Sequence, residues 1–166
     1  MYRILLKEPE AVQKQQEFLD YFPDNFEDFR KTYGYDSQYS KRDLMYSVST
    51  EHVYRGLARL DNVSDTLYYT KLINLSIGGK WEADAVSALQ ETVQKKAMEK
   101  PRLLFGLLLQ YPQKKIYSFW YFYFNSLHLL EGGIPVVFLQ MKSDYLKVYQ
   151  ELCCAFKDSD GQAVCD

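Results

Sequence analysis

The pattern of hydrophobic and polar positions predicts helices along most of the chain. Apolar residues recur at steps of three and four, which places them on one face of an α-helix. The clearest stripe belongs to a long helix that begins at Pro135, and its members are Phe138, Met141, Tyr145, Val148, Leu152 and Ala155. Lys142, Lys147 and Gln150 fall on the opposite face. The stripe is expected to face the core, or alternatively to form a contact between copies of the chain.

Further helical segments are bounded by proline, glycine and capping residues, which start and end helices. They cover residues 9–22, 24–33, 50–60, 64–77, 81–99, 101–111 and 112–124, with a short segment at 42–47. Asp24 is expected to cap the second segment, with Glu27 as its capping-box partner. Leu67 is expected to face the core. In the fifth segment, Gln90 and Gln94 are expected to face solvent.

Residues 116–124 form an almost unbroken aromatic run, IYSFWYFYF. Such residues favour strands, so a central strand is one interpretation. A helix is favoured because Pro112 suits a helix start, residues 113–115 are good helix formers, and the neighbouring segments are helical. A helix that is apolar on most sides belongs in the middle of a helical array. Trp120 is then expected to lie in the core.

Together these elements predict an all-α fold, a single-domain array of about seven or eight helices around a central aromatic helix. Short connections favour antiparallel neighbours. A chain of 166 residues can bury a core without disulfides or metal. We expect the domain to cover residues 1–157 and a polar, flexible tail to cover 158–166. Helix pairs recur, but no residue pattern repeats with them as it would in a solenoid.

Composition and net charge refine this picture. The chain has 15 Tyr, 10 Phe and 2 Trp, which favour a firm core and tyrosine-rich interfaces. The net charge of −2 lacks the excess of Lys and Arg that a general phosphate-binding surface for nucleic acid needs. A nucleic-acid partner is therefore not expected.

Acidic residues are concentrated near the N-terminus. Between residues 8 and 28 there are seven acids and one base, Lys14. This segment is either a solvated helix face or a docking surface for a basic protein partner. The candidate docking residues are Glu17, Asp20, Asp24, Glu27 and Asp28.

No catalytic motif is recognisable. His52 and His128 lie on different segments without cysteines at metal-ligand spacing, so no metal and no cofactor are expected. The adjacent Cys153 and Cys154 do not belong to a disulfide framework, and at least one of these thiols is expected to be buried in a helix. His128 and Glu131 are either an acid–base pair or ordinary surface groups. The best candidate ligand site is the end of the aromatic helix, with Tyr117, Tyr121, Asn125 and His128.

The chain shows no targeting or membrane-spanning pattern. Its N-terminal apolar run is too short for a secretory signal peptide, and no stretch approaches the length of a membrane span. The most apolar region, residues 103–124, is interrupted by the polar residues 113–115. We therefore expect a cytoplasmic protein without membrane association.

Residues 111–128 read YPQKKIYSFWYFYFNSLH. This segment resembles a stretch, close to SFWxFxFDxxHP, of small helical bacterial proteins of immunity type from polymorphic toxin systems. Asn125 replaces the acidic residue of that pattern, and Leu129 replaces its proline. The resemblance implies a cytoplasmic protein that neutralises a partner by binding it. The family has no catalytic residues to transfer to this chain.

The function expected first is that of a non-enzymatic protein-binding protein of immunity or regulatory type. The absence of catalytic motifs, the many tyrosines and the acidic N-terminal segment favour it. The alternative is a small-molecule or peptide binder, with or without catalysis, that uses a pocket near the end of the aromatic helix. The sequence leaves the oligomeric state open.

Overall fold

The computed structural model describes residues 12–34, 48–82, 85–125 and 133–160. Within these ranges the backbone forms helices and no strand, which confirms the all-α class. The elements are α2 (Val12–Tyr21), α3 (Phe26–Tyr33), η2 (Glu51–Gly56), η3 (Leu57–Arg59), α4 (Asp65–Ser76), α5 (Ala85–Glu99), α6 (Pro101–Leu108), α7 (Gln113–Phe124), α8 (Val136–Leu139) and α9 (Leu146–Asp160). η2 is a π-helix and η3 a 3-10 helix. The short helix expected at 42–47 lies outside the described residues.

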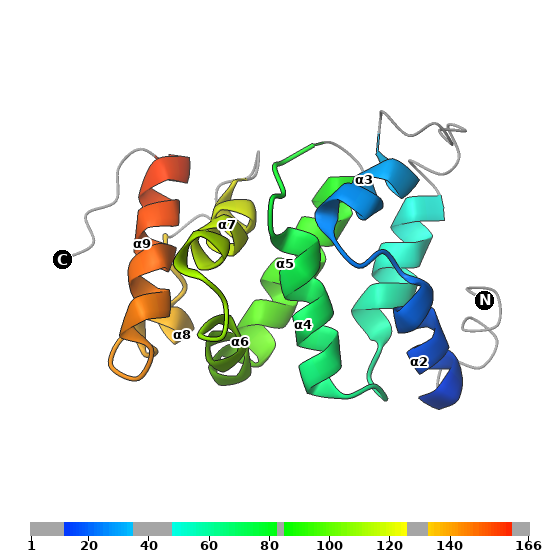
Figure 1. The fold of residues 1–166 in the computed structure, drawn as a ribbon, viewed down its shortest axis with the longest axis horizontal. Coiled ribbons are helices and arrows are strands. Elements are labelled where there is room, and N and C mark those ends of the chain that lie inside the picture. Colours follow the sequence, from blue (N-terminus) through cyan, green and yellow to red (C-terminus); the bar gives the residue numbers. More distant parts are fainter. Residues whose placement is uncertain (1–11, 35–47, 83–84, 126–132, 161–166) are drawn as a thin grey trace.

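The helices form an elongated row that follows the order of the sequence (Figure 1). α2 and α3 lie at one end, α9 lies at the other, and α4, α5 and α6 lie between them. α7 packs against α9 in the most extensive helix pair of the described structure, and it also contacts α4 and α5. The predicted multi-helix array with an enclosed aromatic helix is confirmed.

The aromatic run forms α7, which begins at Gln113 with Pro112 as its N-cap, one residue later than predicted. The backbone N–H groups of Lys115 and Ile116 donate to the Pro112 carbonyl at 2.8 and 3.2 Å. The buried side chains of α7 are Ile116, Phe119, Trp120, Phe122, Tyr123 and Phe124. The strand interpretation is wrong, because the elements that contact α7 are helices and supply no strand partner.

Trp120 lies at the centre of a cluster of aromatic rings. It is fully buried, and its ring centroid lies 5.3 Å from those of both Phe105 in α6 and Phe138 in α8. The rings of Tyr123 and Phe124 lie 5.5 and 6.3 Å from it. Most of these pairs are tilted or edge-to-face, an arrangement that the ring quadrupoles favour. The cluster therefore joins α6, α7 and α8.

A second cluster of rings joins the N-terminal helices. Phe22 and Tyr33 lie 6.1 Å apart between ring centroids. The Tyr33 hydroxyl lies 2.7 Å from Nδ1 of His52 in η2, and burial lowers the pKa of this imidazole. Phe26 of α3 contacts Phe122 of α7, with ring centroids 5.7 Å apart. The contact between Phe26 and Phe122 links this N-terminal cluster to the aromatic helix.

The ring cluster around Trp120 contains two polar atoms that cost stability. Trp120 Nε1 and Tyr123 Oη are buried, and neither has a hydrogen-bond partner among the described residues. An unpaired buried donor costs about 1–3 kcal/mol. Burial also raises the pKa of the Tyr123 phenol, which keeps this group neutral. The large area that each ring buries offsets the cost.

The long helix predicted from Pro135 onward is interrupted. Turns at residues 140–144 separate α8 from α9. In these turns the Ser143 hydroxyl donates to the Asp144 carboxylate, which also accepts a hydrogen bond from Arg102 of α6. Short polar side chains of this kind compete with helical backbone hydrogen bonds. The Arg102–Asp144 pair links these turns to α6.

The apolar stripe of this region is nevertheless buried. Phe138, Val148 and Leu152 are fully enclosed in the interior, so the stripe is not available as a contact between copies of the chain. Cys153 is buried and Cys154 exposed, as expected for a helix with one covered thiol. α9 ends at Asp160, past the boundary expected at residue 157.

Four further local predictions are wrong, at Asp24, Leu67, Gln90 and Gln94. The N-cap of α3 is Asn25, whose Oδ1 accepts a hydrogen bond from the Asp28 backbone N–H at 2.9 Å, and not Asp24. Leu67 is exposed because the tyrosines that follow it occupy the buried face of α4. Gln90 is buried instead of exposed because its amide donates hydrogen bonds to the end of α7.

We expect Trp120→Ala to lower the free energy of unfolding by about 3–5 kcal/mol, because it removes the central ring of the cluster. Urea unfolding followed by circular dichroism measures the loss. Val136→Ala, at a side chain that is 69% exposed, is the control and should change stability by less than about 0.5 kcal/mol. Unfolding of Trp120→Ala at the wild-type urea concentration would contradict the placement of this ring.

Tyr123→Phe should instead raise the free energy of unfolding by about 1 kcal/mol, because it removes an unpaired buried hydroxyl and keeps the ring. The comparison is Tyr68→Phe, which removes a buried hydroxyl that donates to the Leu57 carbonyl at 3.0 Å. That variant should lose about 1 kcal/mol. Equal losses in the two variants would show that the Tyr123 hydroxyl has a partner.

Candidate functional site

The end of α7, where the sequence places a ligand site, joins three segments of the chain. Asn125 is the C-cap, and its backbone N–H donates to the Tyr121 carbonyl at 2.8 Å. Its side-chain oxygen accepts from the Trp81 backbone N–H at 3.0 Å, and its carbonyl accepts from the Gln90 side chain at 2.9 Å. Asn125 therefore ties α7 both to α5 and to the segment before α5. His128 lies outside the described residues.

Two glutamines of α5 bond to the last carbonyls of α7. Gln90 donates to the Phe122 carbonyl as well as to that of Asn125, and Gln94 donates to the Tyr123 carbonyl at 2.8 Å. The last carbonyls of a helix have no partner within it. The four-residue spacing places both amides on one face of α5. Gln94, predicted to face solvent, is therefore half-buried and directed toward α7.

Tyr117 and Tyr121 form the outer edge of α7. Their rings are nearly parallel, at 21°, with centroids 6.0 Å apart. The Tyr117 hydroxyl donates to the Asp158 carboxylate of α9 at 2.7 Å, and this hydrogen bond, with burial, raises the pKa of Tyr117 to about 12. The Asn125 side-chain amide lies 3.4 Å from the Tyr121 hydroxyl. The candidate residues thus lie along one edge, but their polar atoms already have partners within the chain.

The acidic candidates lie on α2, on α3 and between them, at one end of the row of helices (Figure 1). Glu17 accepts a hydrogen bond from the Gln13 amide at 3.3 Å. Asp20 accepts one from the Gln16 amide at 2.8 Å. In the described part of the chain, neither carboxylate has a cationic partner. Of the two residues, Asp20 is exposed and Glu17 is half-buried.

The other acidic candidates have cationic partners. Asp24 pairs with Lys71 of α4, whose side chain is only 11% exposed. Glu27 and Asp28 both pair with Lys31, at 2.7 and 3.7 Å. The pairs with Lys31 are well exposed, so they contribute little to stability. They do neutralise charge, so among the described residues Glu17 and Asp20 of α2 are the candidate acids without a cationic partner.

Tyr21 is a surface feature that the sequence did not single out. Its side chain is 78% exposed, the highest value among the large hydrophobic residues that the structure describes. It follows Glu17 by one helical turn, so these two side chains are neighbours on α2. Asp20 and Tyr21 are exposed and Glu17 is half-buried. The spacing of apolar residues does not reveal which ring stays uncovered, because that depends on the neighbouring helices.

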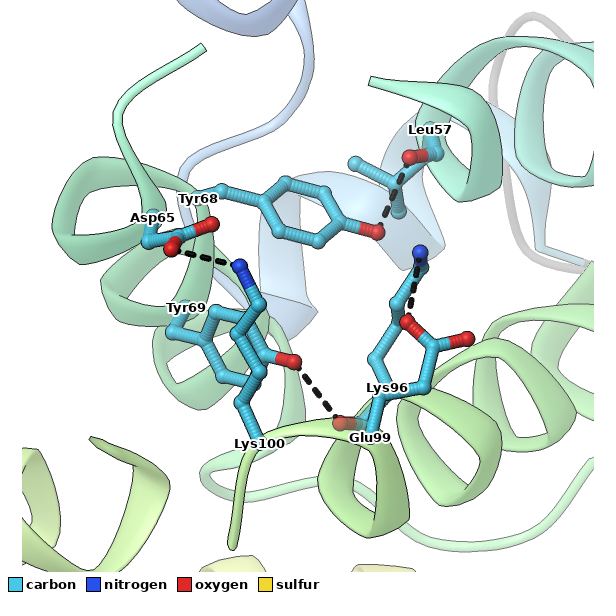
Figure 2. Close-up of polar contacts among 7 residues, drawn as sticks. All are labelled: Leu57, Asp65, Tyr68, Tyr69, Lys96, Glu99 and Lys100. Carbon is cyan, nitrogen blue, oxygen red and sulfur yellow. Dashed lines mark hydrogen bonds and ion pairs between the residues drawn. The ribbon is translucent and has the colours of Figure 1, made fainter. Parts of the chain in front are cut away.

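A polar cluster lies where the end of α5 meets α4 (Figure 2). Lys96 Nζ donates to Glu99 at 2.9 Å and lies 5.9 Å from the centroid of the Tyr68 ring. The Tyr68 hydroxyl donates to the Leu57 carbonyl at 3.0 Å, and the Tyr69 hydroxyl donates to the Lys96 carbonyl at 2.8 Å. These contacts hold the Lys96 side chain, which is only 13% exposed.

Two surface hollows adjoin this cluster. One of about 410 Å³ lies between the η2–η3 stretch and α5, and its polar lining comprises Tyr54, Arg59, Glu91, Thr92, Lys95 and Lys96. The other, of about 650 Å³, lies between α4, α6 and the α8 region. In the larger hollow Lys100 pairs with Asp65, and Arg102 pairs with Asp144. In the smaller hollow Lys96 pairs with Glu99, whereas Arg59 and Lys95 have no ion pair among the described residues.

Comparisons with known proteins found no similar protein. No family model matches the sequence, and no curated protein or solved structure matches it. Within the described residues, no group of His, Cys, Asp and Glu is arranged to hold a metal ion. No helix of the described chain is both long and apolar enough to cross a membrane. Function must therefore be inferred from the surfaces of the chain itself.

We expect Gln90→Leu to lower the free energy of unfolding by about 1–3 kcal/mol, because the Phe122 and Asn125 carbonyls lose their donor. Thermal and urea unfolding measure the effect. Gln150→Leu, on the exposed face of α9, is the matched control and should stay within about 0.5 kcal/mol of the wild type. Equal stability of the two variants would rule out Gln90 as the side chain that caps α7.

Proposed function

We propose that this chain is a non-enzymatic, cytoplasmic protein-binding protein that docks a basic partner through α2. The docking surface comprises Glu17, Asp20 and Tyr21, and we call it the α2 surface. In its specific form the proposal is an immunity-type protein that neutralises a toxin in a one-to-one complex. The resemblance of residues 111–128 to immunity-type proteins supports a toxin as the partner.

The exposed ring of Tyr21 carries this proposal. A side chain that is 78% exposed contributes little to the core. Tyrosine is enriched at protein interfaces because its ring buries a large area at a small cost in conformational entropy, and its hydroxyl finds a partner. Other tyrosines of the chain, such as Tyr68 and Tyr69, are buried. Tyr21 thus has the exposure of an interface anchor.

The charge beside Tyr21 indicates the chemistry of the partner. Glu17 and Asp20 have no cationic partner among the described residues, whereas the acids on and before α3 do. Uncompensated carboxylates attract a basic surface over roughly a Debye length, about 8–10 Å at moderate salt. Such complementarity increases the association rate and selects against acidic partners. A basic protein is therefore the partner that this surface fits.

The alternative, a pocket at the end of α7, has less support. The Tyr117 hydroxyl is bonded to Asp158, and the Asn125 side chain is bonded to the Trp81 backbone. A ligand at this site would have to replace these bonds, each of which contributes about 0.5–1.5 kcal/mol. On the α2 surface the Tyr21 ring is 78% exposed and Asp20 is exposed, so these groups can contact a partner without the loss of a contact to another helix.

We expect Tyr21→Ala, and separately Glu17→Gln with Asp20→Asn, to weaken the complex at least about tenfold. The partner would be isolated from the source cells by affinity capture at low salt and then titrated calorimetrically. Added salt should weaken the wild-type complex and reduce the difference between it and the charge-neutral double variant. It should change the relative effect of Tyr21→Ala much less, because that variant removes no charge.

The matched controls are Val136→Ala and Asp158→Asn, which alter exposed side chains of α8 and α9, toward the opposite end of the row of helices from α2. Both should bind within about twofold of the wild type. Wild-type affinity in both α2 variants would disprove the location of the docking surface. Failure to recover a basic one-to-one partner would disprove the function itself.

A further inference from the structure

The smaller hollow, of about 410 Å³, has more cations than acids in its lining. Arg59, Lys95 and Lys96 line it, together with one carboxylate, Glu91. Lys96 has Glu99 as its partner. Arg59 and Lys95 have no hydrogen bond or ion pair within the described residues. This sets the smaller hollow apart from the larger one, in which the cations are paired.

The wall opposite α5 is formed by an uncommon element. η2 is a π-helix, a conformation that is rare in proteins and frequently occurs at functional sites. Gly56, at its end, lies against the Phe18 ring, where a Cβ atom would come within 2.5 Å of Phe18 Cζ. Glycine therefore permits the close approach to α2. The π-helical backbone beside the hollow therefore distinguishes this site independently of the charged side chains that line it.

The Tyr54 side chain crosses from η2 to α5. Its hydroxyl donates to Oε2 of Glu91, which holds the carboxylate at the wall of the hollow. A carboxylate has two acceptor oxygens, so Oε1 of Glu91 can still accept a hydrogen bond from a ligand. The only acid in the lining is therefore positioned as an acceptor, while Arg59 and Lys95 are available to an anion.

We infer that this hollow binds a small phosphate monoester, with Arg59 and Lys95 contacting the phosphate and Glu91 accepting a hydrogen bond from a hydroxyl of the organic part. A phosphate monoester is close to a dianion at neutral pH, and the lining supplies two unpaired cations to match it. The planar fork of Arg59 suits bidentate contact with phosphate oxygens. Lys96 keeps two further N–H donors beyond its bond to Glu99.

The volume sets the size of the ligand. About 410 Å³ lies within the range of about 300–1,000 Å³ that is typical of small-molecule sites. It suits a phosphorylated metabolite, and it is too small for a folded nucleic acid. The hollow shares no lining residue with the α2 surface. Loss of phosphate binding and loss of protein binding can therefore be distinguished by experiment.

Calorimetric titration of the full chain with glycerol phosphate tests the inference, and saturable one-to-one binding is expected. Glycerol, which lacks the phosphate, should show no binding. Arg59→Gln with Lys95→Gln should weaken glycerol phosphate binding at least about tenfold. Lys114→Gln with Lys115→Gln removes the same charge from the exposed first turn of α7 and should stay within about twofold.

Two further measurements are needed. One identifies the ligand class, and the other checks that a loss of binding in a variant is not caused by misfolding. Malonate, a dicarboxylate, should bind at least about tenfold more weakly than glycerol phosphate, because it lacks a phosphate group and a hydroxyl for Glu91. Thermal unfolding without ligand checks that each variant is folded. If the double variant is destabilised, Lys95→Gln alone is compared with Lys115→Gln. The assignment would be overturned by any of three results. These are the absence of saturable binding, equal weakening in the Lys114/Lys115 control and the Arg59/Lys95 variant, and equal affinity for malonate and glycerol phosphate.

Discussion

The covering of one aromatic helix is the constraint on which the rest of this structure depends. α7 is 12 residues long, and half of its side chains are buried. Burial of large rings is the largest favourable contribution that side chains of this kind make to folding. α9, α4 and α5 contact α7 directly, while Phe105 and Phe138 bring α6 and α8 to its central tryptophan. Gln90 and Gln94 then satisfy the carbonyls that this covered helix exposes at its end.

The packing of α7 uses the polar groups that the sequence predicted as a ligand site. The described polar groups at the end of α7 bond to α5, to α9 and to the segment before α5. The surfaces proposed for recognition are the α2 surface, at the N-terminal end of the row (Figure 1), and the hollow between the η2–η3 stretch and α5. Tyr21 and Arg59 belong to these surfaces, and neither contributes to the ring cluster around Trp120. Recognition can therefore be altered there at little cost to the core.

The helices and most of their buried faces could be predicted from the sequence, because periodic apolar positions and proline or glycine breakers act over a few residues. The predictions were wrong where a distant contact decides the outcome. Gln90 has the polarity of a surface residue, yet it is buried because the end of α7 lies over it. The helix after Pro135 ends early, where Asp144 is held by Arg102 from another helix.

The candidate sites show the same division. The sequence by itself determined the fold class, the aromatic helix and the location of an acidic segment, since each follows from local composition and spacing. Only the tertiary structure decided which charges remain unpaired. Lys71 of α4 neutralises Asp24 of the acidic segment from a distant part of the chain, whereas Arg59 and Lys95 have no ion pair among the described residues. Exposure and pairing depend on residues far apart in the chain that folding brings together, and no local pattern records those contacts.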